Sequence, residues 1–175
     1  MPSTVFGLPT HALFVHATVV LIPLATLAVL LHAVWPAARR RLGALTPLLA
    51  LVALVLTPLS TASGEQLERM VGHSALVEQH AELADGLMPW VIGLFVTSVA
   101  VWLVGDPRVL RGHAGRLLAL RWVPVAATVL AVVAAVGTAQ QIVRVGHAGA
   151  EATWSDVVAH PAQGPGGPPR DGDDG

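Results

Sequence analysis

Four long apolar runs separated by short connections constrain this 175-residue chain more than any other feature. They cover about residues 12–35, 42–62, 86–104 and 122–145, and each holds the roughly 20 apolar residues with which a helix crosses a hydrocarbon layer about 30 Å thick. With 54% hydrophobic and only 12% charged residues, the chain has too little polar surface to cover a globule in water. The sequence therefore predicts an all-α integral membrane protein: a four-transmembrane-helix bundle formed by one domain over residues 1–158.

Both ends of the chain differ from these runs. Residues from His160 onward read HPAQGPGGPPRDGDDG, with almost nothing to bury, which predicts a disordered tail over residues 159–175. The segment from Met1 to Pro9 carries no positive charge, and the run after it lacks a clear cleavage site. We therefore expect no cleaved signal peptide.

Arginine positions predict the orientation. The connection after the first run holds three arginines, and the connection after the third holds four: Arg39, Arg40 and Arg41, then Arg108, Arg111, Arg116 and Arg121. The segment between Gly64 and Asp85 has five acids and one arginine. Because cytoplasmic loops carry the excess of basic residues, both arginine-rich loops should be cytoplasmic and both termini outside. All ten basic residues are arginine, a composition that suggests a GC-rich bacterial genome and hence a bacterial plasma membrane.

Several function classes are disfavoured by composition. The net charge of −1 and the lack of a basic stripe argue against nucleic-acid binding. The absence of cysteine excludes thiolate metal sites and thiol nucleophiles. Nucleophile elbows, phosphate-binding glycine loops and zinc-protease motifs are also missing, so whether the chain is an enzyme stays open.

Histidines gather on the side predicted to face outward. Five of the eight fall there, namely His11, His16, His73, His80 and His147, whereas His32 and His113 lie on the inner side and His160 in the tail. His16 lies some 7 Å inside the first span, where lipid disfavours an imidazole, so we expect it to point into the bundle. His32 is expected to snorkel at the inner interface.

The outer segment predicts an amphipathic helix between spans two and three. At helical spacing the histidines share a stripe with leucines and the acids lie opposite: His73, Leu76, His80, Leu83 and Leu87 against Glu78, Glu82 and Asp85. We expect this outer interfacial helix to lie on the mouth of the bundle and to turn at Gly86 into the third span.

The separation of the histidines from the acids on this helix bears on the kind of metal site that could form. A Zn, Mn or Fe site of mixed ligands needs acids and imidazoles on the same face. Haem b, held by two axial imidazoles in an apolar cleft, tolerates leucine neighbours better. The preferred cofactor ligands are His16, His80 and His147, and a transition metal ion could also use His11 and His73. Taken singly, each histidine is better explained by a hydrogen bond to a loop carbonyl or by a helix cap, and only the cluster of five makes a shared site an equal alternative.

Three functions follow from these alternatives. The first is a haem-binding or metal-binding redox or electron-transfer module with a membrane redox partner. The second is a transporter or channel subunit in which the histidines form a proton or metal pathway. Four spans without charges in their middles make a complete transporter less favoured unless the chain forms a homo-oligomer. The third is a non-catalytic membrane assembly subunit. The lipid bilayer is a partner in all three.

Three stretches carry a resemblance: GLPTHALFVHATVVLIPLA, then SGEQLERMVG followed by VEQHAELAD, and finally VGHAGAEATW. From Gly7 to Trp154 the chain resembles the bacterial membrane family called domain of unknown function 2231. The resemblance implies that His11, His16, His80 and His147 occupy the characteristic positions of the family, and it suggests redox work. Ala12 and Ala17 replace the proline and the aromatic residue that relatives tend to carry there.

Overall fold

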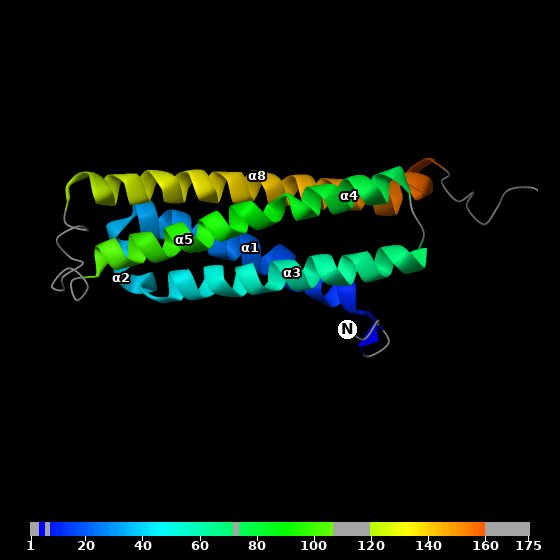
Figure 1. Cartoon of the computed structure of the whole chain (residues 1–175), viewed down its shortest axis with the longest axis horizontal. Helices are drawn as coiled ribbons and strands as arrows, with labels where there is room; N and C mark the ends of the chain where they lie inside the picture. The colour runs from blue at the N-terminus through cyan, green and yellow to red at the C-terminus, as the bar shows by residue number, and fades with distance from the viewer. Residues whose placement is uncertain (1–3, 6–7, 72–73, 107–119, 160–175) are drawn as a thin grey trace, which may run out of the picture.

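The computed structural model describes residues 4–5, 8–71, 74–106 and 120–159. Two short antiparallel strands, β1 (Thr4–Val5) and β2 (Leu8–Pro9), precede the helices. The described helices are α1 (Thr10–Val34), α2 (Pro36–Leu42), α3 (Leu45–Val71), α4 (Ala75–Asp85), α5 (Leu87–Gly105) and α8 (Trp122–Ala159). Figure 1 shows the long helices side by side along a common axis. The predicted tail lies outside the described residues, except for Ala159.

Four helical segments are long and apolar enough to cross a membrane. They are Thr10–Val34, Leu45–Arg69, Ala75–Gly105 and Trp122–Ser155. The prediction of four membrane-compatible helices in an all-α bundle is therefore confirmed. α2 is a short connection at one end, and Pro36 begins it because proline tolerates the first helical turn.

The core of the bundle is built from small residues. Alanines such as Ala25, Ala53 and Ala131 are fully buried together with Ile22 and Leu94. Small side chains let the helix backbones approach closely, which suits packing in lipid. The core therefore holds the four helices at short range over most of their apolar length.

Buried threonine hydroxyl groups in the same interior are hydrogen-bonded within their own helices. Thr26 Oγ1 donates to Ile22 O, Thr57 Oγ1 to Ala53 O and Thr138 Oγ1 to Ala134 O, each at 2.7–2.9 Å within its own helix. Such local bonds satisfy a hydroxyl where no water is present.

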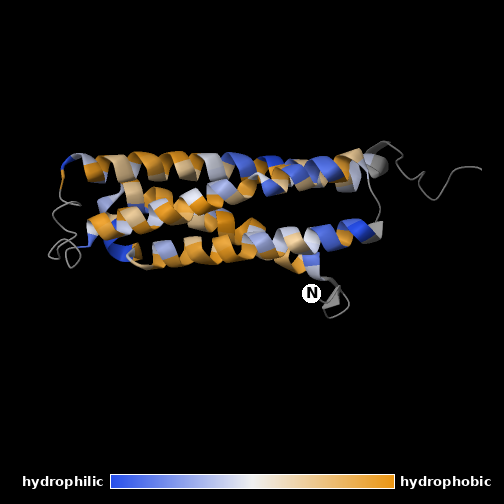
Figure 2. Ribbon diagram, viewed as in Figure 1, coloured by the Kyte–Doolittle hydropathy of each residue, from blue (hydrophilic) through white to orange (hydrophobic). Residues whose placement is uncertain are grey.

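The outer surface of the bundle is apolar instead of polar. Large side chains point away from the core, among them Val20 at 64% and Val143 at 69% exposure. Figure 2 shows the apolar band over the middle of the bundle and polar residues at its two ends. This distribution fits a protein whose solvent is lipid.

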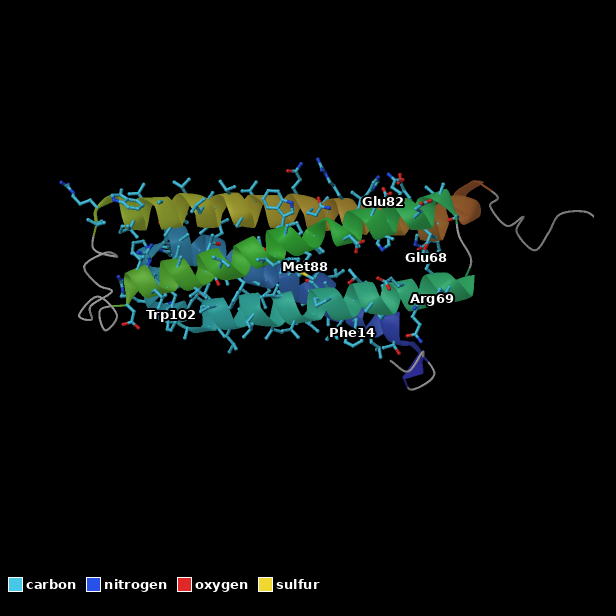
Figure 3. All side chains as sticks on the ribbon, viewed as in Figure 1. Phe14, Glu68, Arg69, Glu82, Met88 and Trp102 are labelled. Carbon is cyan, nitrogen blue, oxygen red and sulfur yellow. The ribbon has the colours of Figure 1, made fainter. Side chains whose placement is uncertain are left out.

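The two ends differ in charge. The arginine end, where α2 lies, carries Arg39, Arg40, Arg41 and Arg121. The acidic end carries Glu65, Glu68, Glu78, Glu82, Asp85 and Glu151, and Figure 3 labels Glu68 and Glu82 there. We call these two ends the arginine end and the acidic end.

Helices at the acidic end run past the predicted span limits. α8 has 38 residues, so it is about 57 Å long, against about 30 Å of hydrocarbon. α3 likewise continues to Val71. A hydrophobic run ends where polar residues begin, but polar residues do not break a helix. α3 and α8 therefore continue beyond the apolar band, and we call their parts beyond residues 62 and 145 the polar stub.

The direction of α4 differs from the expected turn at Gly86. This glycine has helical dihedral angles (φ −63°, ψ −12°), so α4 continues into α5 with little change in the direction of the helix axis. α4 packs along α8 and lengthens the bundle (Figure 1). Glu78, Glu82 and Asp85 are exposed, while His80 and Leu83 are partly buried.

Candidate functional site

His11 ties the start of α1 to α3. Its Nδ1 lies 3.2 Å from Ser60 O and 3.1 Å from Ser63 Oγ. The imidazole rests on Gly64, where an added Cβ would lie 3.1 Å from Cε1 of His11. Because a carbonyl oxygen only accepts hydrogen bonds, the bond to Ser60 assigns the ring hydrogen to Nδ1. The contact fixes both the position and the tautomer of the ring.

His80 makes the equivalent contact between α4 and α8. Its Nδ1 donates to Val145 O at 3.1 Å. The ring lies against Gly149, where an added Cβ would come within 2.9 Å of Cε1. Glycine is therefore needed on α8 for this close approach of the imidazole.

His11 and His80 are held in the same way at the acidic end. His11 lies against Ser60 of α3, and His80 lies against Val145 of α8. In each ring the carbonyl bond uses Nδ1, which leaves Nε2 with the lone pair that binds a metal. An imidazole held by a carbonyl through its other nitrogen is the usual arrangement of a metal-ligating histidine. We call these two residues the imidazole pair.

His16 is not part of the pair, contrary to the expectation that it points into the bundle. It is exposed, and its Nδ1 donates to Ala12 O of its own helix at 2.6 Å. The buried face of α1 passes through Thr18 and Ile22, and His11 lies on that face seven residues before Thr18. His16 precedes Thr18 by two residues, which places it about 200° around the helix from Thr18. It therefore faces outward.

His147 also lies off the bundle interior. Its side chain is 75% exposed, and its Nε2 is 3.3 Å from Glu151 Oε1 one turn later. The neighbouring Ala148 is the buried residue of this turn. The structure therefore does not bring together His16, His80 and His147, the three preferred ligands. His73 lies outside the described residues.

Among the described residues, no group of three or more histidine, aspartate or glutamate side chains is placed to hold a metal ion. The imidazole pair therefore offers two protein ligands. The supporting groups at Ser60, Ser63 and Gly64 were not foreseen, although the small-residue sequence STASG opposite a histidine is a signal that could have indicated them.

At the arginine end, the expectation that His32 snorkels is wrong. The imidazole is 1% exposed, and its Nδ1 lies 2.9 Å from Thr46 Oγ1 at the start of α3. Arg39 donates to His32 O at 3.2 Å and to Ala33 O at 2.9 Å, so the arginine caps the last carbonyls of α1. His113 and His160 lie outside the described residues.

No protein-family profile, no curated protein and no solved structure matches this chain.

Proposed function

We propose that this chain is a multi-pass protein of the bacterial plasma membrane that binds a transition metal through His11 and His80, as a redox or electron-transfer module. The observation that supports this function is the orientation of both rings by backbone carbonyls through Nδ1, at 3.2 Å and 3.1 Å.

Two imidazoles suit some metal centres better than others. A structural zinc ion takes four protein ligands, which the imidazole pair does not supply. Haem b would be held by two imidazoles and would need no carboxylate. A single ion whose remaining positions are filled by water is the other form of the proposal. The residues of this chain would hold either one at the boundary between the apolar band and the polar stub.

Orientation is part of the same proposal. The excess of arginine at one end makes that end cytoplasmic under the positive-inside rule. The imidazole pair and the polar stub then face outward, where a redox partner could reach them. Both chain termini would lie outside the cell.

The test is metal analysis and visible spectroscopy of the detergent-purified protein. The wild-type protein should carry a metal, and a haem form should show a Soret band with split α and β bands on reduction. His11→Ala and His80→Ala should each lower affinity by more than the roughly 10- to 100-fold that loss of an outer-shell partner costs. His16→Ala and His147→Ala are matched controls that should bind as wild type.

Ser63→Ala gives a second measurement that leaves both ligands in place. It removes the hydroxyl 3.1 Å from His11 Nδ1, so affinity should fall about 10-fold, within the range for outer-shell partners. A colourless, metal-free wild-type protein would contradict the proposal and favour the assembly-subunit interpretation. Equal loss of metal in all four histidine variants would contradict the assignment to His11 and His80.

A further inference from the structure

A hollow at the arginine end lies far from the imidazole pair. It has a volume of about 640 Å³ and is lined by His32, Arg39, Arg40, Gly43, Trp102, Gly105 and Asp106. The end of α1, the short helix α2 and the end of α5 surround it, and Figure 3 labels Trp102 on α5. We call it the arginine hollow.

The charge of the arginine hollow favours an anion. Its lining has two arginines against one acid, Asp106, and so a net charge of +1 with His32 neutral. The guanidinium of Arg39 already donates hydrogen bonds to the carbonyls of His32 and Ala33. Because arginine carries five N–H donors, further donors remain for a ligand. Arg40 is exposed beside it.

The position of the hollow indicates where the anion comes from. It lies where α1 and α5 end, which in a membrane-spanning bundle is the level of the lipid headgroups. Trp102 lines it, and tryptophan prefers this boundary because its ring is apolar and its indole N–H is polar. A second hollow at this end, of about 200 Å³ between α1 and α2, is lined by apolar side chains such as Leu31, Trp35 and Leu42 and by Arg41.

We propose that the arginine hollow binds the phosphate of an anionic phospholipid headgroup from the leaflet at that end of the bundle. Basic pockets between transmembrane helices bind anionic headgroups in this way. Arg39 and Arg40 supply the donors, and Trp102 lines the hollow beside them. This site is independent of the imidazole pair, so the failure of one proposal leaves the other intact.

The experiment compares lipids retained by the full-length protein. The protein is reconstituted in nanodiscs of phosphatidylglycerol or phosphatidylcholine, released into detergent and weighed by native mass spectrometry. Phosphatidylglycerol should be retained preferentially. Arg40→Gln should weaken this preference about fivefold, the factor that corresponds to one arginine near a membrane surface. Arg41→Gln is the matched control, because Arg41 is exposed on the same short helix but lines the second hollow and not the arginine hollow.

Three outcomes would overturn the proposal. The first is equal retention of the two lipids, and the second is an equal effect of the Arg40 and Arg41 substitutions, which would indicate unspecific attraction. The third is displacement of phosphatidylglycerol by millimolar inorganic phosphate, which would indicate a soluble phosphate ligand instead of a lipid. Because Arg40 is exposed, its variant should keep the thermal unfolding temperature of the wild-type protein, which is measured alongside.

Discussion

Single glycines decide how closely the helices of this bundle approach one another. At the crossing of α5 and α8 the ring of Trp90 lies on Gly137, where an added Cβ would come within 2.0 Å of Cζ3. Gly137→Ala should therefore lower the free energy of unfolding by about 1–3 kcal/mol, because the ring must move within a packed interface. Thermal unfolding in detergent measures this loss.

Gly146 of the same helix is the matched control. An added Cβ there meets nothing within 4 Å. Gly146→Ala should leave stability unchanged or raise it by up to about 1 kcal/mol, the helix-propensity difference between the two residues. Similar losses in both variants would contradict the packing argument.

Gly149 links packing to the candidate metal site. Gly149→Ala would bring a methyl group within 2.9 Å of Cε1 of His80, so the imidazole must shift. Metal affinity should then fall about 10-fold although both ligands remain, as for other changes outside the ligands themselves. Metal titration measures the effect, and wild-type affinity in this variant would show that the position of the His80 ring is not critical.

At the scale of elements, α4 depends on contacts with α8. Gln141, 9% exposed, donates from Nε2 to Leu83 O at 2.7 Å and thereby ties the last turn of α4 to α8. Gln141→Leu should destabilise this contact by about 1–3 kcal/mol, since it leaves a carbonyl without its partner. Faster amide hydrogen exchange across α4 would be the readout.

The neighbouring Gln140 supplies the control for this element. It is exposed on the same helix, so Gln140→Leu removes an amide of the same kind without a partner on α4. Exchange in α4 should then match the wild-type protein. Equal exchange in the two variants would show that the side chain of Gln141 does not hold α4.

For the whole molecule, the orientation in the membrane can be read by labelling. The chain has no cysteine, so each single-cysteine variant carries one reactive thiol. A membrane-impermeant maleimide should label Glu82→Cys in intact cells and Arg41→Cys only after permeabilisation. Labelling of both in intact cells would contradict the proposed topology, and with it the outward-facing imidazole pair.

The bundle as a whole also shows which features could be predicted from the sequence. The number of spans followed from the length and composition of each apolar run, since the thickness of a bilayer fixes both. The two charged ends followed from charge counts alone. The lengths of α3 and α8 did not follow, because hydropathy marks where a helix leaves lipid and not where its hydrogen bonding ends.

By itself, the sequence determined that this chain forms four membrane-compatible helices with arginines at one end and acids at the other, because length, apolarity and charge are local properties. Only the tertiary structure decided that His11 and His80 are each held against a neighbouring helix while His16 and His147 face outward. In lipid the outer surface of a helix is as apolar as its packed face, so apolar periodicity does not distinguish them. The positions of the His11 and His80 rings come from long-range contacts with Ser60 and Val145, which only the folded bundle provides.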